Sequence, residues 1–274
     1  KIYPVNPKGG IIEGLQAYTN VNEIPGEVDL AIIVVNAKFV LDTIDQCHQK
    51  GIKGLCIITP GFKETGKEGA EAEKQLLEKV REYGMRCVGP NCLGVVNTHP
   101  DIRMDGCFAE SLPERGNIGF VSQSGALGGG ILNILKDLNL GFAQFISIGN
   151  QADVNAETAL EYWENEPDVE QILLYMESIQ NPANFRKLAS RITKKKPILA
   201  LKAGRSAAGA SAASSHTGSL AGADKAAAAL LHQSGVIREF SLQNLFETAK
   251  VFANCPIPKG DRVAIITNSG GPGI

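Results

Sequence analysis

Residues 117–138 read NIGFVSQSGALGGGILNILKDL, and this stretch contains one complete strand–turn–helix unit. The apolar run at 117–121 predicts a strand, and the spacing of apolar side chains over 126–138 predicts a helix. The polar turn at 122–125 therefore lies at the carboxyl end of a strand and the amino end of a helix. Open α/β sheets place their ligands at this edge, so the unit predicts both the fold class and the location of the chemistry.

The alternation of strand and helix patterns continues on the carboxyl side of this unit. Strand patterns lie at residues 142–148, 171–176, 197–201 and 236–238, and helix patterns lie at 155–165, 182–195, 223–233 and 242–252. Strands interleaved with helices of this length indicate βαβ units and a parallel sheet. We therefore expect one parallel α/β domain over residues 113–256.

The amino-terminal side shows the same alternation. Strand patterns lie at residues 1–5, 29–35, 54–59 and 85–88, and helix patterns lie at 40–47 and 69–83. The run at 29–35 is almost entirely apolar, as expected of a strand covered on both faces. Proline, glycine and mixed charges interrupt the periodicity at 101–117, which separates a first domain, 1–112, from the second. The run RVAIIT at 262–267 predicts a strand that opens a third domain, 257–274, and we expect both ends of the chain to be cut.

Composition and charge argue against several classes of protein. The 274 residues carry a formal net charge of −2, which argues against binding to nucleic acid or to a membrane surface. No uninterrupted apolar run reaches ~18 residues, and the first residues have no signal-peptide pattern. The six cysteines form no CxxC pair and no zinc-finger spacing, so we expect reduced thiols, no metal site and a cytoplasmic location.

Four short polar turns follow the expected strands of the first domain. They contain glycine, proline or asparagine and lie at residues 6–10, 36–37, 59–61 and 89–94. In a parallel sheet such turns meet at one edge, where backbone N–H groups and helix amino termini can bind phosphate. Lys8 adds a cation, which suits the phosphates of a nucleotide-like ligand. The alternative is that these turns are tight connections that need glycine and proline for their geometry.

The turn Ser122-Gln123-Ser124-Gly125 has two possible roles. A nucleophile elbow needs glycine two residues before the serine, and those positions hold Phe120 and Ser122 instead. An anion site fits better, because serine hydroxyls and free amides at a helix amino terminus lie at the positive end of the helix dipole. A plain serine N-cap is the alternative. The stretch Asn268-Ser269-Gly270-Gly271 repeats the pattern and offers a second helix start suited to phosphate.

Residues 203–222 follow an expected strand and place His216 among glycine, alanine, serine and threonine. These small neighbours leave the imidazole accessible as a base, a ligand or a nucleophile. Glu177 follows the apolar strand pattern at 171–176, where a buried carboxylate needs a partner. His216 is a candidate, because a carboxylate bonded to one ring nitrogen leaves the other as a lone-pair donor. The alternative is that Glu177 pairs with a lysine or caps an amide.

Six motifs in this order resemble the nucleoside-diphosphate-forming acyl-CoA synthetases, in particular the ADP-forming acetyl-CoA synthetase group related to the succinyl-CoA synthetase α subunit. They are VNPKGG at 5–10, GPNCLG at 89–94, VSQSGALG at 121–128, the strand-end Glu177, SSHTGSLAG at 214–222 and NSGGPG at 268–273. The resemblance covers essentially the whole chain. It implies a Rossmann-like CoA-binding domain followed by flavodoxin-like ligase domains.

The resemblance also implies roles for individual residues. His216 would be transiently phosphorylated, and Glu177 would orient its ring. Phosphate would bind at Ser122, Gln123, Ser124 and Gly125 and at Ser269, Gly270 and Gly271. CoA would bind at the strand-end turns of the first domain, through Pro7, Lys8, Asn36, Thr59, Pro60, Gly61, Asn91, Cys92 and Gly94.

The implied reaction interconverts acyl-CoA, ADP and phosphate with a carboxylic acid, CoA and ATP, and acetate is the expected acid. Acyl phosphate forms first, its phosphoryl group passes to His216, and phosphohistidine then phosphorylates ADP. Helix amino termini would supply donors for the phosphoryl oxygens. ATP or ADP with Mg²⁺ would bind to an ATP-grasp β subunit or fused domain, whose signature we do not find in this sequence. We also expect the assembly to be an oligomer.

Two other functions fit parts of the sequence. One is the regulatory CoA-binding region of a protein lysine acetyltransferase, against which a histidine at position 216 argues. The other is a dinucleotide-dependent dehydrogenase, which only the expected sheet topology supports. The glycine fingerprint of that class, G-x-G-x-x-G after a strand, is not visible, although it would lie before Lys1 if the first strand precedes this chain.

Overall fold

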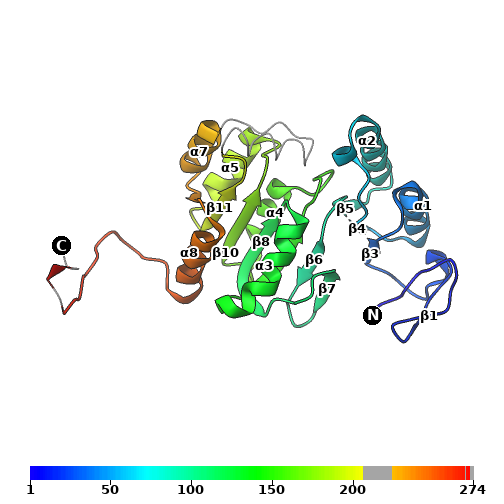
Figure 1. Cartoon of the computed structure of the whole chain (residues 1–274), viewed down its shortest axis with the longest axis horizontal. Coiled ribbons are helices and arrows are strands. Elements are labelled where there is room, and N and C mark those ends of the chain that lie inside the picture. The colour runs from blue at the N-terminus through cyan, green and yellow to red at the C-terminus, as the bar shows by residue number, and fades with distance from the viewer. Residues whose placement is uncertain (206–223, 269, 272–274) are drawn as a thin grey trace.

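The computed structural model describes residues 1–205, 224–268 and 270–271. These residues form a large seven-stranded sheet, a small three-stranded sheet and a two-stranded ribbon. Figure 1 shows the large and small sheets beside each other, with the amino terminus on the side of the small sheet. Most strand pairs are parallel, so the chain is the α/β protein that the sequence predicts.

The large sheet has the strand order β12-β11-β10-β8-β9-β6-β7. Five of its strands are mutually parallel: β8 Arg115–Ser122, β9 Phe142–Ser147, β10 Gln171–Met176, β11 Ile198–Lys202 and β12 Ile237–Glu239. Read from β9 to β12, these five follow the order 2-1-3-4-5, which is flavodoxin-like. In this arrangement the carboxyl ends of β8 and β10 flank the topological switch point, where doubly wound sheets bind ligands.

Helices cover both faces of the large sheet. On one face lie α3 (Gly125–Leu138) and α8 (Leu242–Asn254), and on the other lie α4 (Ala156–Trp163), α5 (Pro182–Ile192) and α7 (Asp224–Gln233). Neighbouring residues of one strand serve opposite faces, since Phe120 packs toward α3 and α8 while Val121 packs toward α4 and α5. The continuous apolar runs of the sequence are therefore explained by burial on both sides.

The small sheet consists of the parallel strands β3 (Leu30–Ile33), β4 (Gly54–Ile57) and β5 (Arg86–Val88). Its core packs against α1 (Val40–Lys50) and α2 (Lys67–Glu82). The expectation that 29–35 is covered on both faces is wrong, because Ile32 and Val34 are 42% and 70% exposed. β3 is an edge strand, and the face opposite the helices is only partly covered.

An antiparallel hairpin, β6 (Gly94–Asn97) and β7 (Met104–Cys107), completes the large sheet. β6 pairs with β9 in the antiparallel sense, so the sheet is not wholly parallel as we expected. The sequence analysis missed both strands, because they are short and contain glycine, aspartate and asparagine, which have low strand propensity. The hairpin also packs against the small sheet through Val95 and Met104, and it therefore joins the two halves.

Two expected strands are absent from the described residues. Residues 1–5 form only an isolated bridge between Val5 and Tyr18, and Pro4 has no N–H group with which to extend it. Residues 262–267 form no strand, and Ile266 is 97% exposed, because no strand of the described chain pairs with them. The remaining short elements are β1 Ile11–Ile12, β2 Leu15–Gln16, and the 3-10 helices η1 Val21–Glu23, η2 Ala37–Phe39 and η3 Lys63–Thr65. Within the described residues, no helix is long and apolar enough to cross a membrane.

Candidate active site

The turn at 122–125 connects β8 to α3 at the switch point of the large sheet. Ser122 Oγ donates a hydrogen bond to the carbonyl oxygen of Ser124 at 2.7 Å. Ser124 Oγ accepts from the backbone N–H of Leu127 at 3.3 Å, which makes Ser124 the N-cap of α3. Both hydroxyls therefore support the turn itself. The feature of this turn best suited to an anion is the amino terminus of α3 at Gly125, where helical N–H groups lack partners within the helix.

Gln123 connects this turn to the end of β10. Its side-chain oxygen accepts hydrogen bonds from the backbone N–H groups of Glu177 at 2.8 Å and Ser178 at 3.0 Å. Its side-chain amide donates to Ser178 Oγ at 3.1 Å. The sequence analysis placed Gln123 among phosphate ligands, whereas these contacts use its side chain to hold the turn that carries Glu177. No sequence pattern pointed to this role, since it depends on the adjacency of β8 and β10.

Glu177 and Lys202 bring opposite charges to neighbouring strand ends. The two side chains are buried, with 6% and 4% of their residue surface exposed. Burial lowers the pKa of the Lys202 ammonium, and the nearby negative charge of Asp224 opposes that shift. The charge of Arg238 adds to the lowering of the Lys202 pKa, while Glu177 opposes it. The sequence analysis missed Lys202, although a lysine at the end of an apolar strand is the signal that would have found it.

Three of the four predicted CoA turns meet at the carboxyl edge of the small sheet. Thr59 Oγ1 donates to the carbonyl oxygen of Val35 at 2.7 Å, which joins the ends of β4 and β3. The backbone N–H of Asn91 donates to the carbonyl oxygen of Thr59 at 3.1 Å, which adds the end of β5. Asn36 accepts from the backbone N–H of Lys38 at 3.2 Å and caps η2. Parallel strands thus bring together residues that lie far apart in the sequence, as predicted.

The remaining predicted CoA residues have other surroundings. In the turn at 6–10, Lys8 donates its backbone N–H to Asn6 Oδ1 at 3.0 Å, and its side chain is exposed beside Pro7. Cys92 is buried, with its thiol donating to the carbonyl oxygen of Ile57 at 3.3 Å. Gly94 lies in β6, where a Cβ atom would stand 2.1 Å from a backbone oxygen of β7. The close approach of β6 and β7 therefore accounts for a glycine at position 94 without any contact to CoA.

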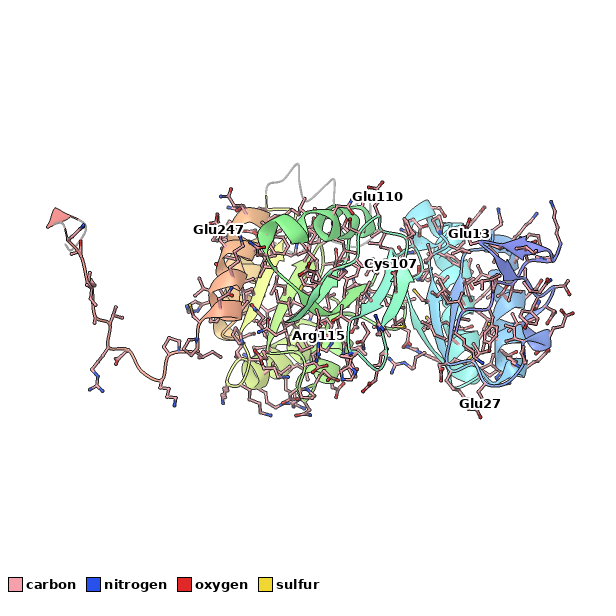
Figure 2. All side chains as sticks on the ribbon, turned by 90° about the horizontal axis from the view of Figure 1, so that it is seen from below. Glu13, Glu27, Cys107, Glu110, Arg115 and Glu247 are labelled. Atoms are coloured by element: carbon pink, nitrogen blue, oxygen red, sulfur yellow. The ribbon has the colours of Figure 1, made fainter. Side chains whose placement is uncertain are left out.

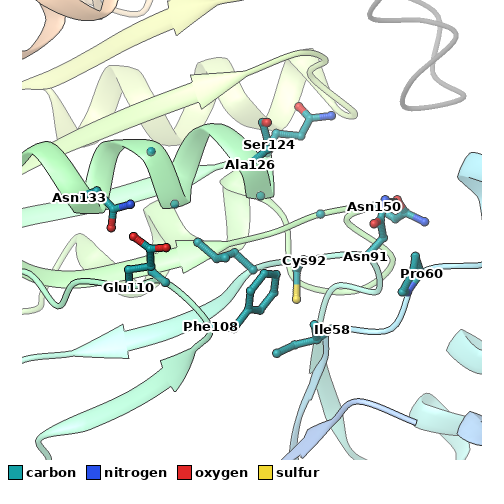
Figure 3. Close-up of a pocket in the computed structure, with 17 residues that line it drawn as sticks. Ile58, Pro60, Asn91, Cys92, Phe108, Glu110, Ser124, Ala126, Asn133 and Asn150 are labelled. Carbon is teal, nitrogen blue, oxygen red and sulfur yellow. Dashed lines mark hydrogen bonds between the residues drawn. The ribbon is translucent and has the colours of Figure 1, made fainter. Parts of the chain in front are cut away.

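A cavity of about 550 Å³ lies between the CoA turns and the amino terminus of α3. The small-sheet side of its lining includes Pro60, Asn91 and Cys92, and the large-sheet side includes Gln123, Ser124 and Gly125. Figure 3 shows Pro60 and Asn91 on one side of the cavity and Ser124 on the other. The structure therefore brings the predicted CoA residues and the predicted phosphate residues to one site.

The far wall of the cavity comes from residues that the sequence analysis did not single out. Phe108 and Glu110 follow β7, and Asn133 projects from α3. Figure 3 shows Glu110 and Asn133 close together at this end, and Figure 2 shows Glu110 where the two halves of the molecule meet. Among the described residues that line the cavity, Glu110 is the one with a charged side chain.

Two groups of predicted site residues are not among the described residues that line the cavity. His216, with the loop around it, and Ser269 lie outside the described residues. Gly270 and Gly271 lie in the exposed segment that follows α8, and Figure 1 shows this segment leading away from α3. The described residues contain no cluster of three or more histidine, cysteine, aspartate or glutamate side chains that could hold a metal ion.

Comparison with known families accounts for both halves of this arrangement. Residues 115–252 match the model of the succinyl-CoA ligase like flavodoxin domain, and residues 1–98 match that of a CoA binding domain. The chain belongs to the succinyl-CoA ligase-like family. Its ligase-like domain supplies the switch point with Gln123 and Glu177, and its CoA-binding domain supplies the turns at Thr59 and Asn91.

Several relatives of this ligase-like chain are known by name. The α subunit of ADP-forming acetate–CoA ligase II from Pyrococcus furiosus is 48% identical over the whole chain. The ADP-forming 4-hydroxybutyrate–CoA ligase of Nitrosopumilus maritimus is 40% identical over the whole chain. The chain covers 59% of the first relative and 39% of the second, so it spans less than two thirds of the length of either.

Two solved structures are similar to this chain over almost its whole length. The dinucleotide-forming acetyl-coenzyme A synthetase 1 of Candidatus Korarchaeum cryptofilum, solved with phosphate and ADP, superposes with a TM-score of 0.92 at 37% identity. That alignment covers 99% of this chain and 58% of the synthetase chain. PH0766 from Pyrococcus horikoshii superposes with a TM-score of 0.86 at 44% identity, again over 99% of this chain and 57% of the other.

Proposed function

We propose that this chain is the CoA-binding and phosphohistidine-carrying part of an ADP-forming acyl-CoA synthetase. The complete enzyme would interconvert acyl-CoA, ADP and phosphate with a monocarboxylic acid such as acetate, CoA and ATP. The observation that carries the proposal is the cavity lined by Pro60 and Asn91 on one side and by the amino terminus of α3 at Gly125 on the other. It would hold a thioester next to a site suited to phosphate, which is what formation of an acyl phosphate requires.

CoA would lie along the carboxyl edge of the small sheet. The turns at Asn36, Thr59–Gly61 and Asn91–Gly94 would face its phosphates and pantetheine arm with backbone N–H groups, and Pro7 and Lys8 would contribute from the amino-terminal turn. The thioester end would enter the cavity. Phosphate would approach it from the turn at 122–125, where helical N–H groups stabilise negative charge without mobile counterions.

His216 would accept the phosphoryl group from acyl phosphate. The neutral ring nitrogen attacks phosphorus, the P–N bond forms as the bond to the acyl oxygen breaks, and the carboxylate leaves. Glu177 would orient the imidazole and stabilise the positive charge that it gains. The buried pair of Glu177 with Gln123 supports this role, because the hydrogen bonds from the Glu177 and Ser178 backbone to Gln123 fix the turn in place. Lys202 would add a positive charge beside the same strand end.

The second half of the reaction would take place on a partner. Phosphohistidine would transfer its phosphoryl group to ADP bound with Mg²⁺ on an ATP-grasp β subunit or a fused ATP-grasp domain. Residues 257–274 would begin a third domain, in which the run RVAIIT pairs with strands outside this chain. The full exposure of Ile266 supports that assignment, since an apolar run of this kind is normally buried.

The experiment is phosphoryl labelling of the enzyme reconstituted with its ATP-grasp partner. We expect acid-labile label from γ-labelled ATP on the wild type and none on His216→Ala. His232→Ala is the matched control, because His232 is exposed near the end of α7 and should be dispensable. Label that persists on His216→Ala, or is lost equally on His232→Ala, would contradict the assignment. CoA binding by a wild type that is never labelled would favour a regulatory CoA-binding region instead.

A further inference from the structure

Asn150 connects the two halves of the molecule at the cavity. It follows β9 of the large sheet, is buried with 5% of its surface exposed, and lines the cavity. Its backbone N–H donates to the carbonyl oxygen of Pro90 at 2.9 Å, and its side-chain oxygen accepts from Asn91 Nδ2 at 3.3 Å. Its carbonyl oxygen accepts from Lys63 Nζ. One residue of the ligase-like half therefore contacts the turns after both β5 and β4.

The side-chain amide of Asn150 also separates two carboxylates. Asn150 Nδ2 donates to Glu64 Oε2 at 2.6 Å and to Glu73 Oε2 at 2.7 Å. Both hydrogens of one amide group are needed for two such contacts, and no other uncharged side chain of this size supplies them. The remaining charge of the cluster is Lys63, whose Nζ lies 3.4 Å from Glu73 Oε1. The amide therefore bridges what would otherwise be a close pair of like charges.

Glu64 transmits this contact to the predicted CoA turn. Glu64 Oε1 accepts from the backbone N–H groups of Gly61 at 2.5 Å and Phe62 at 3.2 Å. Burial favours the protonated form of Glu64, but the hydrogen bonds from Asn150, Gly61 and Phe62 outweigh burial and lower the pKa of the carboxyl. Glu64 is thus held as a carboxylate with one oxygen on Asn150 and the other on the turn.

We propose that Asn150 is a positioning residue for the acyl-CoA reaction. It holds the predicted CoA turns at Gly61 and Asn91 at a fixed position relative to the amino terminus of α3. The inference rests on the proposed function, because it is CoA that these turns would contact. In this proposal the contact between Asn150 and Glu64 helps to position CoA and has no part in phosphorylation of the enzyme. A change at Asn150 should accordingly raise the KM for CoA while leaving phosphorylation by ATP unchanged.

The backbone around Asn150 should survive substitution of its side chain. Ala152 donates its N–H to the carbonyl oxygen of Gly89 at 3.1 Å, and Val154 donates to that of Cys87 at 3.1 Å. These bonds attach the loop to β5 and its following turn independently of the Asn150 amide. Asn150→Asp has nearly the same shape, so its effect reports the lost hydrogen-bond donors and the added charge.

The test uses the enzyme assembled with its ATP-grasp partner. At pH 8 we expect Asn150→Asp to raise the KM for CoA about tenfold or more, because three carboxylates then face one another without the amide donor. The KM should fall again toward pH 6, since repulsion raises the pKa of one of these carboxyls and the protonated group supplies a donor. The wild type should show no such recovery.

A charge-swapped pair gives the sharper control. When Glu64→Gln is combined with Asn150→Asp, the new amide at position 64 donates to the new carboxylate at position 150. The oxygen of that amide can still accept from the backbone N–H of Gly61. We expect Glu64→Gln and Asn150→Asp each to raise the KM for CoA. We expect the double variant to have a lower KM for CoA than Asn150→Asp, although above wild type, because the carboxylate at position 150 still faces Glu73 without an amide donor between them. Thermal unfolding of all variants checks that the fold is retained.

The outcomes separate this inference from the proposed function. If the wild type neither becomes labelled nor forms CoA thioester, the proposed function is wrong. If the wild type is active but the double variant shows no recovery, or labelling by ATP falls in parallel with CoA use, Asn150 is merely structural and the inference is overturned.

Discussion

The side-chain oxygen of Gln123 lies 2.8 Å from the backbone nitrogen of Glu177 and accepts its hydrogen bond. This contact joins the turn at the start of α3 to the turn at the end of β10, so the candidate phosphate site and the candidate histidine partner share one support. Neither turn can shift without affecting the other. The structure of the site at the switch point should therefore depend strongly on this one buried amide.

Replacement of Gln123 should test that dependence. Gln123→Leu leaves the backbone N–H groups of Glu177 and Ser178 buried without their acceptor, and we expect it to lower the free energy of unfolding by about 2–4 kcal/mol. It should also slow phosphorylation of the enzyme. Urea unfolding and labelling by ATP measure the two effects.

The matched variant Gln123→Glu keeps an acceptor for both N–H groups but adds a carboxylate beside Glu177. Its stability should be closer to wild type at pH 5.5 than at pH 8, because protonation of either carboxyl removes the repulsion. Equal losses at both pH values would argue against close contact between these groups.

Gly94 offers a test of the hairpin. Its φ is +126°, and a Cβ atom there would lie 2.1 Å from the carbonyl oxygen of Gly106. Gly94→Ala should therefore cost about 3 kcal/mol or more of folding stability. Gly130 in α3 is the control, since a Cβ atom there meets nothing within 4 Å and alanine should stabilise the helix by up to about 1 kcal/mol. Equal stability of the two variants in urea would contradict the strand pairing.

Lys202 should make stability depend on pH in the alkaline range. Its pKa is lowered by burial, so between the folded and unfolded pKa values the native state binds fewer protons than the unfolded state. Stability contributed through this group therefore rises as pH increases across that window. We expect Lys202→Met to flatten the rise at alkaline pH below the ordinary lysine pKa of about 10.4, measured by urea unfolding. The exposed Lys53 serves as control, and Lys53→Met should leave the slope unchanged.

If the proposed function is correct, Glu110 should influence which acids the complete enzyme accepts. No cation lies among the described residues that line the cavity, and Glu110 would repel a second carboxylate on the acyl chain. We expect wild type to prefer butyrate over succinate, and Glu110→Lys to move the ratio of kcat/KM values toward succinate by about tenfold, because one favourable charge contact at a partly solvated site has about that effect. Glu110→Gln should give a smaller shift in the same direction. An unchanged ratio in both variants would show that the acyl chain does not reach Glu110.

Much of the fold follows from the pattern of apolar residues. The strands β8 to β12 and the helices α3, α4, α5, α7 and α8 lie within a few residues of the expected ranges, because continuous apolar runs and helical spacing are strong signals when both faces of a sheet are buried. The expected edge turns at Thr59 and Asn91 also meet. That result follows from parallel strands alone, since their carboxyl ends must lie on one side of the sheet.

The features that sequence could not supply are those that depend on contacts between distant segments. Gln123 and Asn150 owe their roles to neighbours on other elements of the fold, beyond the reach of local spacing. The hairpin β6–β7 was missed because its strands are short and contain residues of low strand propensity. β6 is stabilised by pairing with β9 on one side and with β7 on the other. The expected strand at 262–267 shows the converse, since strong propensity forms no strand where the described chain offers no partner.

Because the hairpin β6–β7 belongs to the large sheet, the boundary between the two halves in the structure lies earlier in the sequence than the boundary between the two family matches. The family match to the CoA binding domain ends at residue 98 and that to the ligase-like domain begins at residue 115, so β7 belongs to neither match. A fragment starting at residue 115 would expose the edge of β9 with its unpaired backbone groups, which is a template for aggregation. Recombination between relatives should therefore keep residues 94–107 with the ligase-like half, and exchange of CoA-binding halves should succeed best when the crossover precedes Gly94.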